Sequence, residues 1–399
     1  MKILYFGTVC DLKKYDNLLV GCKRKPSVST IVFESALLEG FRQNGADLEI
    51  HSFPMIPTYS HSHLLHFGRC REILPCGYTC QWLNTVNLPG IKQLTRSMDA
   101  RAIMDRWGRE NRGNGVILSY SIPPFLVKNI LRCGEKYGLK TVAIVPDLLR
   151  DMYVNEADKG IQKILKKRYL AGALRLQDGY DGYVYLTEAM HEVVAPDKPY
   201  MVMEGIAGIP TISAQKTEKA SPRAIMYAGM LHEKYGILNL VDAFERLPDK
   251  SIELWLFGDG TAGGAVRRRA EQDRRIRCFG TVDRDKVLEY ERRATLLVNV
   301  RSPAETFTQY SFPSKTIEYM LSGTPLLTTR LPGIPKEYFQ YTFSAADNGV
   351  EELTQGLGCA MACSPETLEN MGNRAREYIV REKNARRQAA RVIRFLEEV

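Results

Sequence analysis

The sequence predicts an α/β protein in which two doubly wound parallel-sheet domains follow one another. Short apolar runs alternate with stretches of helical period along nearly the whole chain, which is typical of parallel sheets. The alternation stops in a polar, turn-rich segment and then begins again with the same order of elements. A chain of 399 residues is also too long for one ordinary core and suits two domains.

The first half, residues 1–205, is expected to form a Rossmann-like domain. The segment SVSTIVFESALLEGFRQNG is one predicted helix, because its apolar residues recur at helical spacing before a glycine. Helical sequence also separates the predicted strands, which are KILYFGT, DLEIHSF, GVILSYS, TVAIVPD, GYVYLT and YMVMEG.

The second half repeats this pattern after a predicted linker at residues 206–222, which has no clear period. A second domain is expected at 223–378, with strands AIMYAG, IELWLFG, RIRCFG, TLLVNV and TPLLTT. Ligands of doubly wound sheets bind beyond the carboxyl ends of the strands, so two facing domains predict a cleft between them. One long helix is expected to end the chain. Its last part, 379–399, keeps an apolar stripe and is predicted to pack back on the first domain.

Composition indicates a globular, cytoplasmic protein. Hydrophobic residues make up 44% of the chain, and no apolar run reaches the roughly 18 residues that a membrane span needs. The start of the chain is too soon charged for a signal peptide and is interpreted as a strand. Nine scattered cysteines favour reduced structural thiols.

We expect no metal and no cofactor. Cys70, Cys76 and Cys80 do not have the spacing of a usual zinc site, and the histidines in SHSHLLHFG are interpreted as a His-rich loop.

The segment FPSKTIEYMLSGTPLL, residues 312–327, predicts an anion-binding helix start. Ser314 is a good N-cap, and the first turn of a helix offers free N–H groups and partial positive charge. Lys315 is repelled by that charge, and a bound phosphate would remove the conflict. Glu318, one turn further in, is a natural acceptor for two adjacent ribose hydroxyls. The pattern therefore favours a nucleotide-diphosphate site, although a surface helix with solvated charges has the same local sequence.

The same segment resembles the donor-binding region of the family-4 retaining glycosyltransferases of GT-B fold (glycosyltransferase group 1). Further similar motifs occur in the same order as in that family, and the resemblance covers nearly the whole chain, most weakly between residues 54 and 110. They are YVYLTEAMHEVV, MVMEGI, YAGMLHEKYGILNLVDAF, WLFGDG and CFGTV.

The resemblance implies a role for individual residues. The first domain would be the acceptor side and the second would bind the nucleotide-sugar donor. Asp147 and Glu305 would orient the transferred sugar as the catalytic pair. The implied donor-binding residues are Gly229 and Lys234 for the diphosphate, Gly280 and Val282 for the base, Ser314 and Lys315 beside the phosphates, and Glu318 for the ribose.

Some positions depart from the family pattern. The usual glutamate eight residues before Glu318 is Tyr310, the usual arginine after Gly229 is Met230, and the usual histidine beside Asp147 is Pro146. The usual glycine pair of a first-domain loop is replaced by KPSVST. We interpret Glu305 as the substitute at the sugar, and the diphosphate is expected to depend more on lysines and backbone amides.

The net charge of +9 is compatible with nucleic acid, an anionic membrane or a phosphorylated small molecule as partner. The loop CKRKPS, residues 22–27, is expected near the phosphates of an acceptor. The basic segment 159–175 predicts either a helix on an anionic membrane surface or a helix with a solvated face. Together they favour a lipid-linked or polysaccharide acceptor in cell-surface glycan synthesis and a peripheral membrane location. Nucleic acid is disfavoured, because exposed aromatics are not interleaved with the basic residues.

Three other functions stay open from the sequence. A dinucleotide-dependent oxidoreductase is suggested by FGDGTAGG, although no acidic strand end follows at the right distance. A nucleotide-sugar epimerase of the same fold is a closer alternative. A non-catalytic nucleotide-sugar-binding relative is the third, because Tyr310 and Met230 replace family residues.

Overall fold

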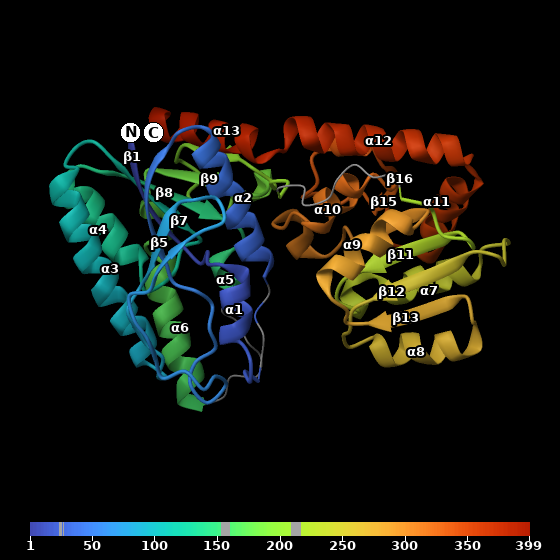
Figure 1. The fold of residues 1–399 in the computed structure, drawn as a ribbon, viewed down its shortest axis with the longest axis horizontal. Coiled ribbons are helices and arrows are strands. Elements are labelled where there is room, and N and C mark those ends of the chain that lie inside the picture. Colours follow the sequence, from blue (N-terminus) through green and yellow to red (C-terminus); the bar gives the residue numbers. More distant parts are fainter. Residues whose placement is uncertain (24–25, 27, 153–159, 209–216) are drawn as a thin grey trace. The chain divides into compact units, whose positions relative to one another are not determined.

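The computed structural model describes residues 1–23, 26, 28–152, 160–208 and 217–399 and divides the chain into two units (Figure 1). The first unit comprises Met1–Ile209 and Asn384–Val399, and the second comprises Pro210–Lys383. The predicted linker therefore spans the boundary between the units and lies partly outside the described residues.

The first unit contains a large sheet, a small sheet and helices. The strands are β1 (Lys2–Gly7), β2 (Asp47–Ser52), β3 (His66–Phe67), β4 (Arg71–Ile73), β5 (Thr79–Trp82), β6 (Thr85–Val86), β7 (Val116–Tyr120), β8 (Lys140–Val145), β9 (Gly182–Tyr185) and β10 (Tyr200–Val202). The helices are α1 (Leu12–Leu18), α2 (Ser29–Gln43), α3 (Ile91–Glu110), α4 (Val127–Tyr137), α5 (Leu149–Met152), α6 (Gly160–Leu174) and α13 (Ala385–Glu398), with short 3₁₀ helices η1 (Gln177–Gly179) and η2 (Glu188–Met190).

In the described part of this unit the large sheet has the order β10-β9-β8-β7-β1-β2-β5-β4. All neighbours are parallel except β4 and β5, and β3 pairs with β6 in a separate antiparallel ribbon. Every residue of β7 and all of β1 beyond Lys2 are buried. Strands covered by helices on both faces need such continuous apolar runs, which is why the sequence marks them so clearly.

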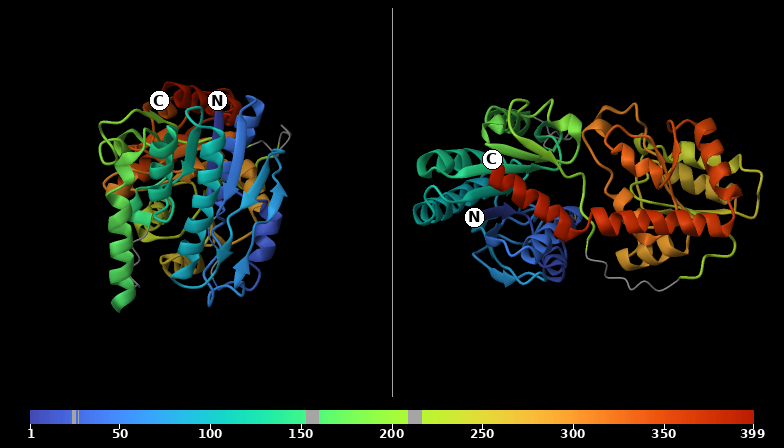
Figure 2. Two further views of the ribbon diagram at one scale, coloured as in Figure 1. Left: turned by 90° about the vertical axis from the view of Figure 1, so that its left-hand side faces the viewer. Right: turned by 90° about the horizontal axis from the view of Figure 1, so that it is seen from above.

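Helix α13 packs on α2 of the first unit (Figures 1 and 2). The approach is close, because a Cβ on Gly40 would lie 2.1 Å from the carbonyl oxygen of Ala385. The prediction of one long terminal helix is wrong. The helix is interrupted at Lys383 and Asn384. The Asn384 side chain accepts a hydrogen bond from the Arg387 N–H at 2.9 Å and caps the start of a new helix.

The second unit is built on a single sheet. Its strands are β11 (Ala224–Ala228), β12 (Glu253–Phe257), β13 (Ile276–Gly280), β14 (Leu296–Asn299), β15 (Leu326–Thr329) and β16 (Phe343–Ala345). Its helices are α7 (Ile237–Glu245), α8 (Gly263–Gln272), α9 (Arg284–Arg293), α10 (Lys315–Ser322), α11 (Val350–Ala362) and α12 (Pro365–Glu382), with η3 (Glu233–Tyr235), η4 (Thr306–Gln309) and η5 (Lys336–Gln340).

The sheet of the second unit is parallel throughout its described strands, in the order β13-β12-β11-β14-β15-β16. Helix α7 packs with α11, and α10 packs with α9 and α12. The chain moves outward from β11 to β12 and β13, then returns to β14 and continues the other way. The predicted α/β class with doubly wound parallel sheets is confirmed in both units.

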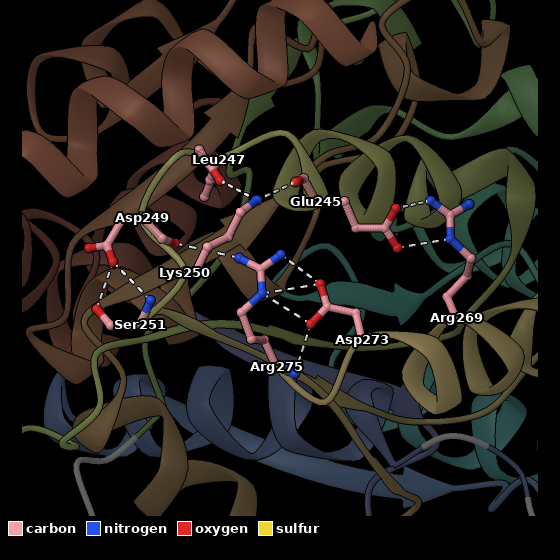
Figure 3. A network of polar contacts seen from close by, with 8 residues as sticks. All are labelled: Glu245, Leu247, Asp249, Lys250, Ser251, Arg269, Asp273 and Arg275. Atoms are coloured by element: carbon pink, nitrogen blue, oxygen red, sulfur yellow. Dashed lines mark hydrogen bonds and ion pairs between the residues drawn. The ribbon is translucent and has the colours of Figure 1, made fainter.

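The amino ends of β12 and β13 are held by a network of polar contacts (Figure 3). The Arg275 guanidinium donates from Nη2 to Asp273 Oδ2 at 2.6 Å and lies 4.7 Å from the ring centre of Phe244. Lys250 donates to the carbonyl oxygens of Glu245 and Leu247 at 3.1 and 2.9 Å, at the end of α7. A lysine placed there satisfies carbonyls that the helix leaves free.

Candidate functional site

The candidate site lies at the carboxyl edge of the sheet in the second unit. Strands β11 and β14 are neighbours, but their connections leave in opposite directions, so a topological switch point lies between them. Ligands of doubly wound sheets bind in the crevice outside the carboxyl ends at such a point. The loops that follow β11 and β14 are therefore the first place to look for binding residues.

These two loops are in direct contact. Gly236, the residue immediately before α7, has φ +76°, and a Cβ there would lie 2.2 Å from the carbonyl oxygen of Val300 after β14. A side chain at this position is therefore excluded by both conformation and space. The close approach brings η3, in the first loop, beside η4, in the second.

Two cations and two aromatic rings gather where the loops meet. Lys234 Nζ lies 5.2 Å from the ring centre of Tyr235 and 5.8 Å from that of Phe307. The Arg301 guanidinium lies 5.0 Å from the same Tyr235 ring, and the two rings are 6.0 Å apart. Within the described residues, neither Lys234 nor Arg301 pairs with a carboxylate. Two uncompensated cations on one edge suit an anionic ligand.

Arg301 was missed by the sequence analysis. The signal was present, because the residue stands two positions after the apolar run of β14. Its significance depends on β14 lying beside β11, two strands that are about seventy residues apart in the chain. Met230, which stands where the family has arginine, is exposed. Arg301, in the loop after β14, therefore supplies a positive charge next to the loop in which Met230 replaces the arginine.

Gly258 and Gly260 of FGDGTAGG are explained by backbone packing. A Cβ on Gly258 would lie 1.9 Å from the carbonyl oxygen of Gly229, and one on Gly260 would lie 2.5 Å from that of Leu231. The Gly229 N–H also donates to the Phe257 carbonyl at 3.0 Å. These glycines thus fit the turn after β12 against the turn after β11, a use that needs no dinucleotide.

Helix α10 carries the predicted phosphate and ribose residues, and the expectation that the Ser314 side chain caps this helix is wrong. Ser314 stands at the N-cap position, but its side chain makes no capping hydrogen bond. Lys315 is already neutralised, since its ammonium pairs with Glu318 and lies 3.3 Å from Glu291 Oε1. The Glu318 carboxylate, together with the adjacent Glu291 carboxyl group, therefore offsets the repulsion between Lys315 and the helix dipole.

Glu318 keeps the properties that a ribose acceptor needs. Its side chain is 22% exposed, and Oε2 accepts a hydrogen bond from Arg284 Nη2 at 3.1 Å. Burial raises the pKa of Glu318, but the nearby Lys315 and Arg284 charges outweigh this and lower it below its usual value. The carboxylate thus stays ionised. Two ionic partners leave part of its roughly four acceptor positions for other donors.

The remaining second-unit candidates lie along the same edge. Gly280 ends β13 with φ +65° and accepts a hydrogen bond from the Gly258 N–H at 2.7 Å. Val282 follows it and is half-buried. The Phe279 ring stacks on the Phe257 ring with 4.3 Å between the ring centres, so two stacked aromatic rings pack beside Gly280. Glu305, in the loop after β14, is exposed, and in the described part of the chain nothing bonds to its carboxylate.

In the first unit Asp147 follows the end of β8 and is exposed. The second-unit candidates thus share one sheet edge, while Asp147 occupies the equivalent edge of the other sheet. Half of the CKRKPS loop, residues 24, 25 and 27, lies outside the described residues. In the part of the chain that the structure describes, no group of three His, Cys, Asp or Glu side chains could hold a metal ion. No described helix is long and apolar enough to cross a bilayer.

The fold agrees with comparisons to known proteins. The chain has the fold of GT-B glycosyltransferases. Residues 222–362 match the family model "Glycosyl transferases group 1". That segment lies within the second unit, which is therefore a glycosyltransferase domain, and the prediction of a glycosyltransferase-class enzyme is confirmed. No curated protein matches the chain in sequence.

Solved structures of the same fold cover the whole chain. They include sucrose-phosphate synthase from Thermosynechococcus elongatus, with 13% identity, a TM-score of 0.64, and coverage of 100% of this chain and 99% of that one. A trehalose-6-phosphate protein from E. coli, solved with UDP-2-fluoro glucose, has 10% identity, a TM-score of 0.65 and the same coverage. The lipopolysaccharide outer core galactosyltransferase WaaB has 12% identity, a TM-score of 0.60 and again that coverage. At such identities the likeness is one of fold.

Proposed function

We propose that this protein transfers a sugar from a nucleotide-diphosphate sugar to an acceptor with retention of configuration, as the family-4 enzymes do. The observation that carries the proposal is the pair Lys234 and Arg301, which face one tyrosine ring at the switch point without a carboxylate partner in the described residues. A UDP-sugar is the first donor to test, because a protein of the same fold was solved with UDP-2-fluoro glucose.

Each part of the donor has residues suited to it along this edge. Lys234 and Arg301 bind the diphosphate, and Gly229 lets the phosphates approach the backbone. Glu318 accepts hydrogen bonds from the ribose hydroxyls. Gly280 and Val282 line the base, while Ser314 lies at the start of α10, where free N–H groups favour an anion. Lys315 has a changed role, since it positions Glu318 instead of contacting phosphate.

The chemistry needs charge stabilisation and positioning more than covalent help. The bond between the anomeric carbon and the diphosphate oxygen breaks, and the carbon bonds to the acceptor oxygen on the same face. The acceptor proton passes to the departing phosphate oxygen. Lys234 and Arg301 stabilise the charge that develops on that leaving group. Asp147 and Glu305 orient the sugar.

We infer that the acceptor is lipid-linked or a polysaccharide, and that the protein works at the cytoplasmic face of a membrane. Helix α6 supports this inference. Its Lys166, Lys167 and Arg168 are exposed, and the same helix exposes the apolar side chains of Ile164 and Tyr169. Basic and apolar groups on one exposed helix suit an anionic bilayer surface.

The donor site is tested by thermal unfolding with UDP. We expect UDP to raise the melting temperature and Glu318→Ala to remove most of that rise, because the ribose loses its acceptor. Glu289→Ala is the matched control, since Glu289 is an exposed carboxylate on the adjacent helix α9 and should leave the rise unchanged. A full rise in Glu318→Ala would show that the ribose assignment is wrong.

The membrane inference is tested by co-sedimentation with vesicles. We expect binding to phosphatidylserine vesicles at low salt, weaker binding to neutral vesicles, and loss of the difference when Lys166, Lys167 and Arg168 are changed to glutamate. If the unmodified protein stays in the supernatant with anionic vesicles at low salt, the membrane inference is discarded.

A further inference from the structure

A buried carboxyl group beneath the candidate ribose site has no part in the proposed function. Glu291 lies on α9, and its side chain is fully buried, with an exposed fraction of 0%. Its Oε1 lies 3.3 Å from Lys315 Nζ, whereas its Oε2 has no hydrogen-bond partner in the described residues. Burying a carboxyl oxygen without a partner costs free energy, so its retention needs a reason.

Glu291 belongs to a row of charged groups that crosses from α9 to α10. Lys315 pairs with both Glu291 and Glu318, these two carboxyl groups also interact with each other, and Arg284 pairs with the other oxygen of Glu318. The Tyr319 ring centre is 5.5 Å from the Lys315 ammonium on the same helix. Lys219 donates hydrogen bonds to the carbonyl oxygens of Arg292 and Ala294 at 2.9 and 3.0 Å.

We propose that Glu291 is a positioning residue for nucleotide binding, which anchors Lys315 from below and so keeps Glu318 directed to the ribose. The inference depends on the proposed function, since it assigns a ligand to Glu318. Lys315 has three N–H donors, so it can hold both carboxyl groups at once. Glu291 does not contact the nucleotide and acts through Lys315.

The protonation of Glu291 decides how Lys315 is shared. The pKa of Glu291 is raised to about 8, chiefly by burial and also by the nearby Glu318 charge, while Lys315 lowers it in part. At pH 7 Glu291 is therefore mostly neutral, and the Lys315 ammonium forms its ion pair with Glu318. As the pH rises through about 8, an ionised Glu291 competes for Lys315 and adds negative charge beneath the ligand. Nucleotide affinity should then fall.

The test is a titration of UDP and of uridine by calorimetry between pH 7 and 8.5, below the pH at which the uracil N3–H of both ligands ionises. For the wild-type protein we expect both dissociation constants to rise several-fold across this range. Glu291→Gln has nearly the same shape and no titration, so its affinity should match the wild type at pH 7 and then stay constant. Glu291→Leu removes the anchor and should bind both ligands more weakly at every pH.

Glu289→Gln is the matched control on the same helix. Its side chain is exposed and pairs only with Arg293 among the described groups, so it should keep the wild-type pH profile. Binding with the same profile in wild type and Glu291→Gln would overturn this inference and leave the proposed function intact. If the wild-type protein binds neither ligand at any pH, both are overturned.

The buried proton is also measurable without any ligand. A folded-state pKa of about 8, raised from 4.5 by burial, means that the unfolded chain binds fewer protons between those values. Wild-type stability should therefore decrease as the pH rises from about 5 to 8, and Glu291→Gln should decrease less. Urea unfolding at each pH measures the free energy of unfolding. If this free energy falls equally with pH in wild type and Glu291→Gln, Glu291 carries no such proton and the proposed pH dependence is overturned.

Discussion

The two edges of the second-unit sheet differ in whether their cations have carboxylate or carbonyl partners. At the amino edge, Arg275, Arg269 and Lys250 are each matched with carboxylates or carbonyl oxygens (Figure 3). At the carboxyl edge, Lys234 and Arg301 face only aromatic rings in the part of the chain that is described. Paired cations therefore hold the amino edge, whereas the carboxyl edge also carries two cations without a carboxylate partner in the described residues, beside the paired Lys315 and Arg284.

The difference separates cations that hold the fold from cations kept for a ligand. A paired arginine fixes the loop that carries its partner, and its removal leaves a carboxylate without compensation. Two neighbouring cations without partners gain little from the folded state, because they repel one another. Their charge is compensated when an anion binds. Substitutions at the amino edge should therefore lower stability, and substitutions of the unpaired cations at the carboxyl edge should lower UDP affinity. The reverse result would contradict this distinction.

The largest effect is expected for Arg275→Met. Asp273 would lose its bidentate partner between α8 and β13, and we expect the free energy of unfolding to fall by about 2 kcal/mol. The UDP affinity of the folded protein should stay within twofold of wild type. Urea unfolding and calorimetry measure the two quantities. Arg274→Met, an exposed neighbour, is the control and should change neither. A large loss of UDP affinity in Arg275→Met would abolish the distinction between the edges.

A smaller free-energy change, but one confined to binding, is expected for Arg301→Met. We expect UDP affinity to fall 10- to 20-fold, which corresponds to about 1.4–1.8 kcal/mol, while uridine affinity and stability remain nearly unchanged. Arg330→Met is the matched control. Arg330 also follows a strand end, and its guanidinium lies 5.7 Å from the ring centre of Phe339, but it donates to Ser344 Oγ at 3.1 Å. Equal losses for UDP and uridine would exclude a diphosphate role for Arg301.

Most of the fold was readable from the sequence, because its central strands are buried on both faces. Runs such as those of β1, β7 and β11 are continuous and apolar, and their order along the chain identifies doubly wound sheets. The segment 54–110 was not readable, since β3 to β6 are only two to four residues long. The break before α13 was hidden because the apolar stripe of the terminal segment continues across Asn384.

The site was predictable in part, for a related reason. Lys234, Glu318 and Gly280 each lie close to an end of a recognisable strand or helix, so their common edge follows from the chain order. Arg301 could be placed beside Lys234 only once β14 was known to neighbour β11. Glu291 required the packing of α9 on α10, which no local pattern reports. The assigned roles of all these residues stay predictions until substitutions are measured.

The smallest effect in this comparison is expected for Lys234→Met, with a three- to tenfold loss of UDP affinity at low salt. Lys234 is exposed, so its field is screened by dissolved ions, whereas Arg301 is half-buried and less accessible to them. The loss in Lys234→Met should therefore shrink between 50 and 500 mM salt, while the loss in Arg301→Met persists. The UDP affinities of the two single variants and the double variant, measured over this salt range, give the contribution of each cation to binding. A Lys234→Met loss that does not change with salt would mean that this lysine contacts the diphosphate as closely as Arg301 does.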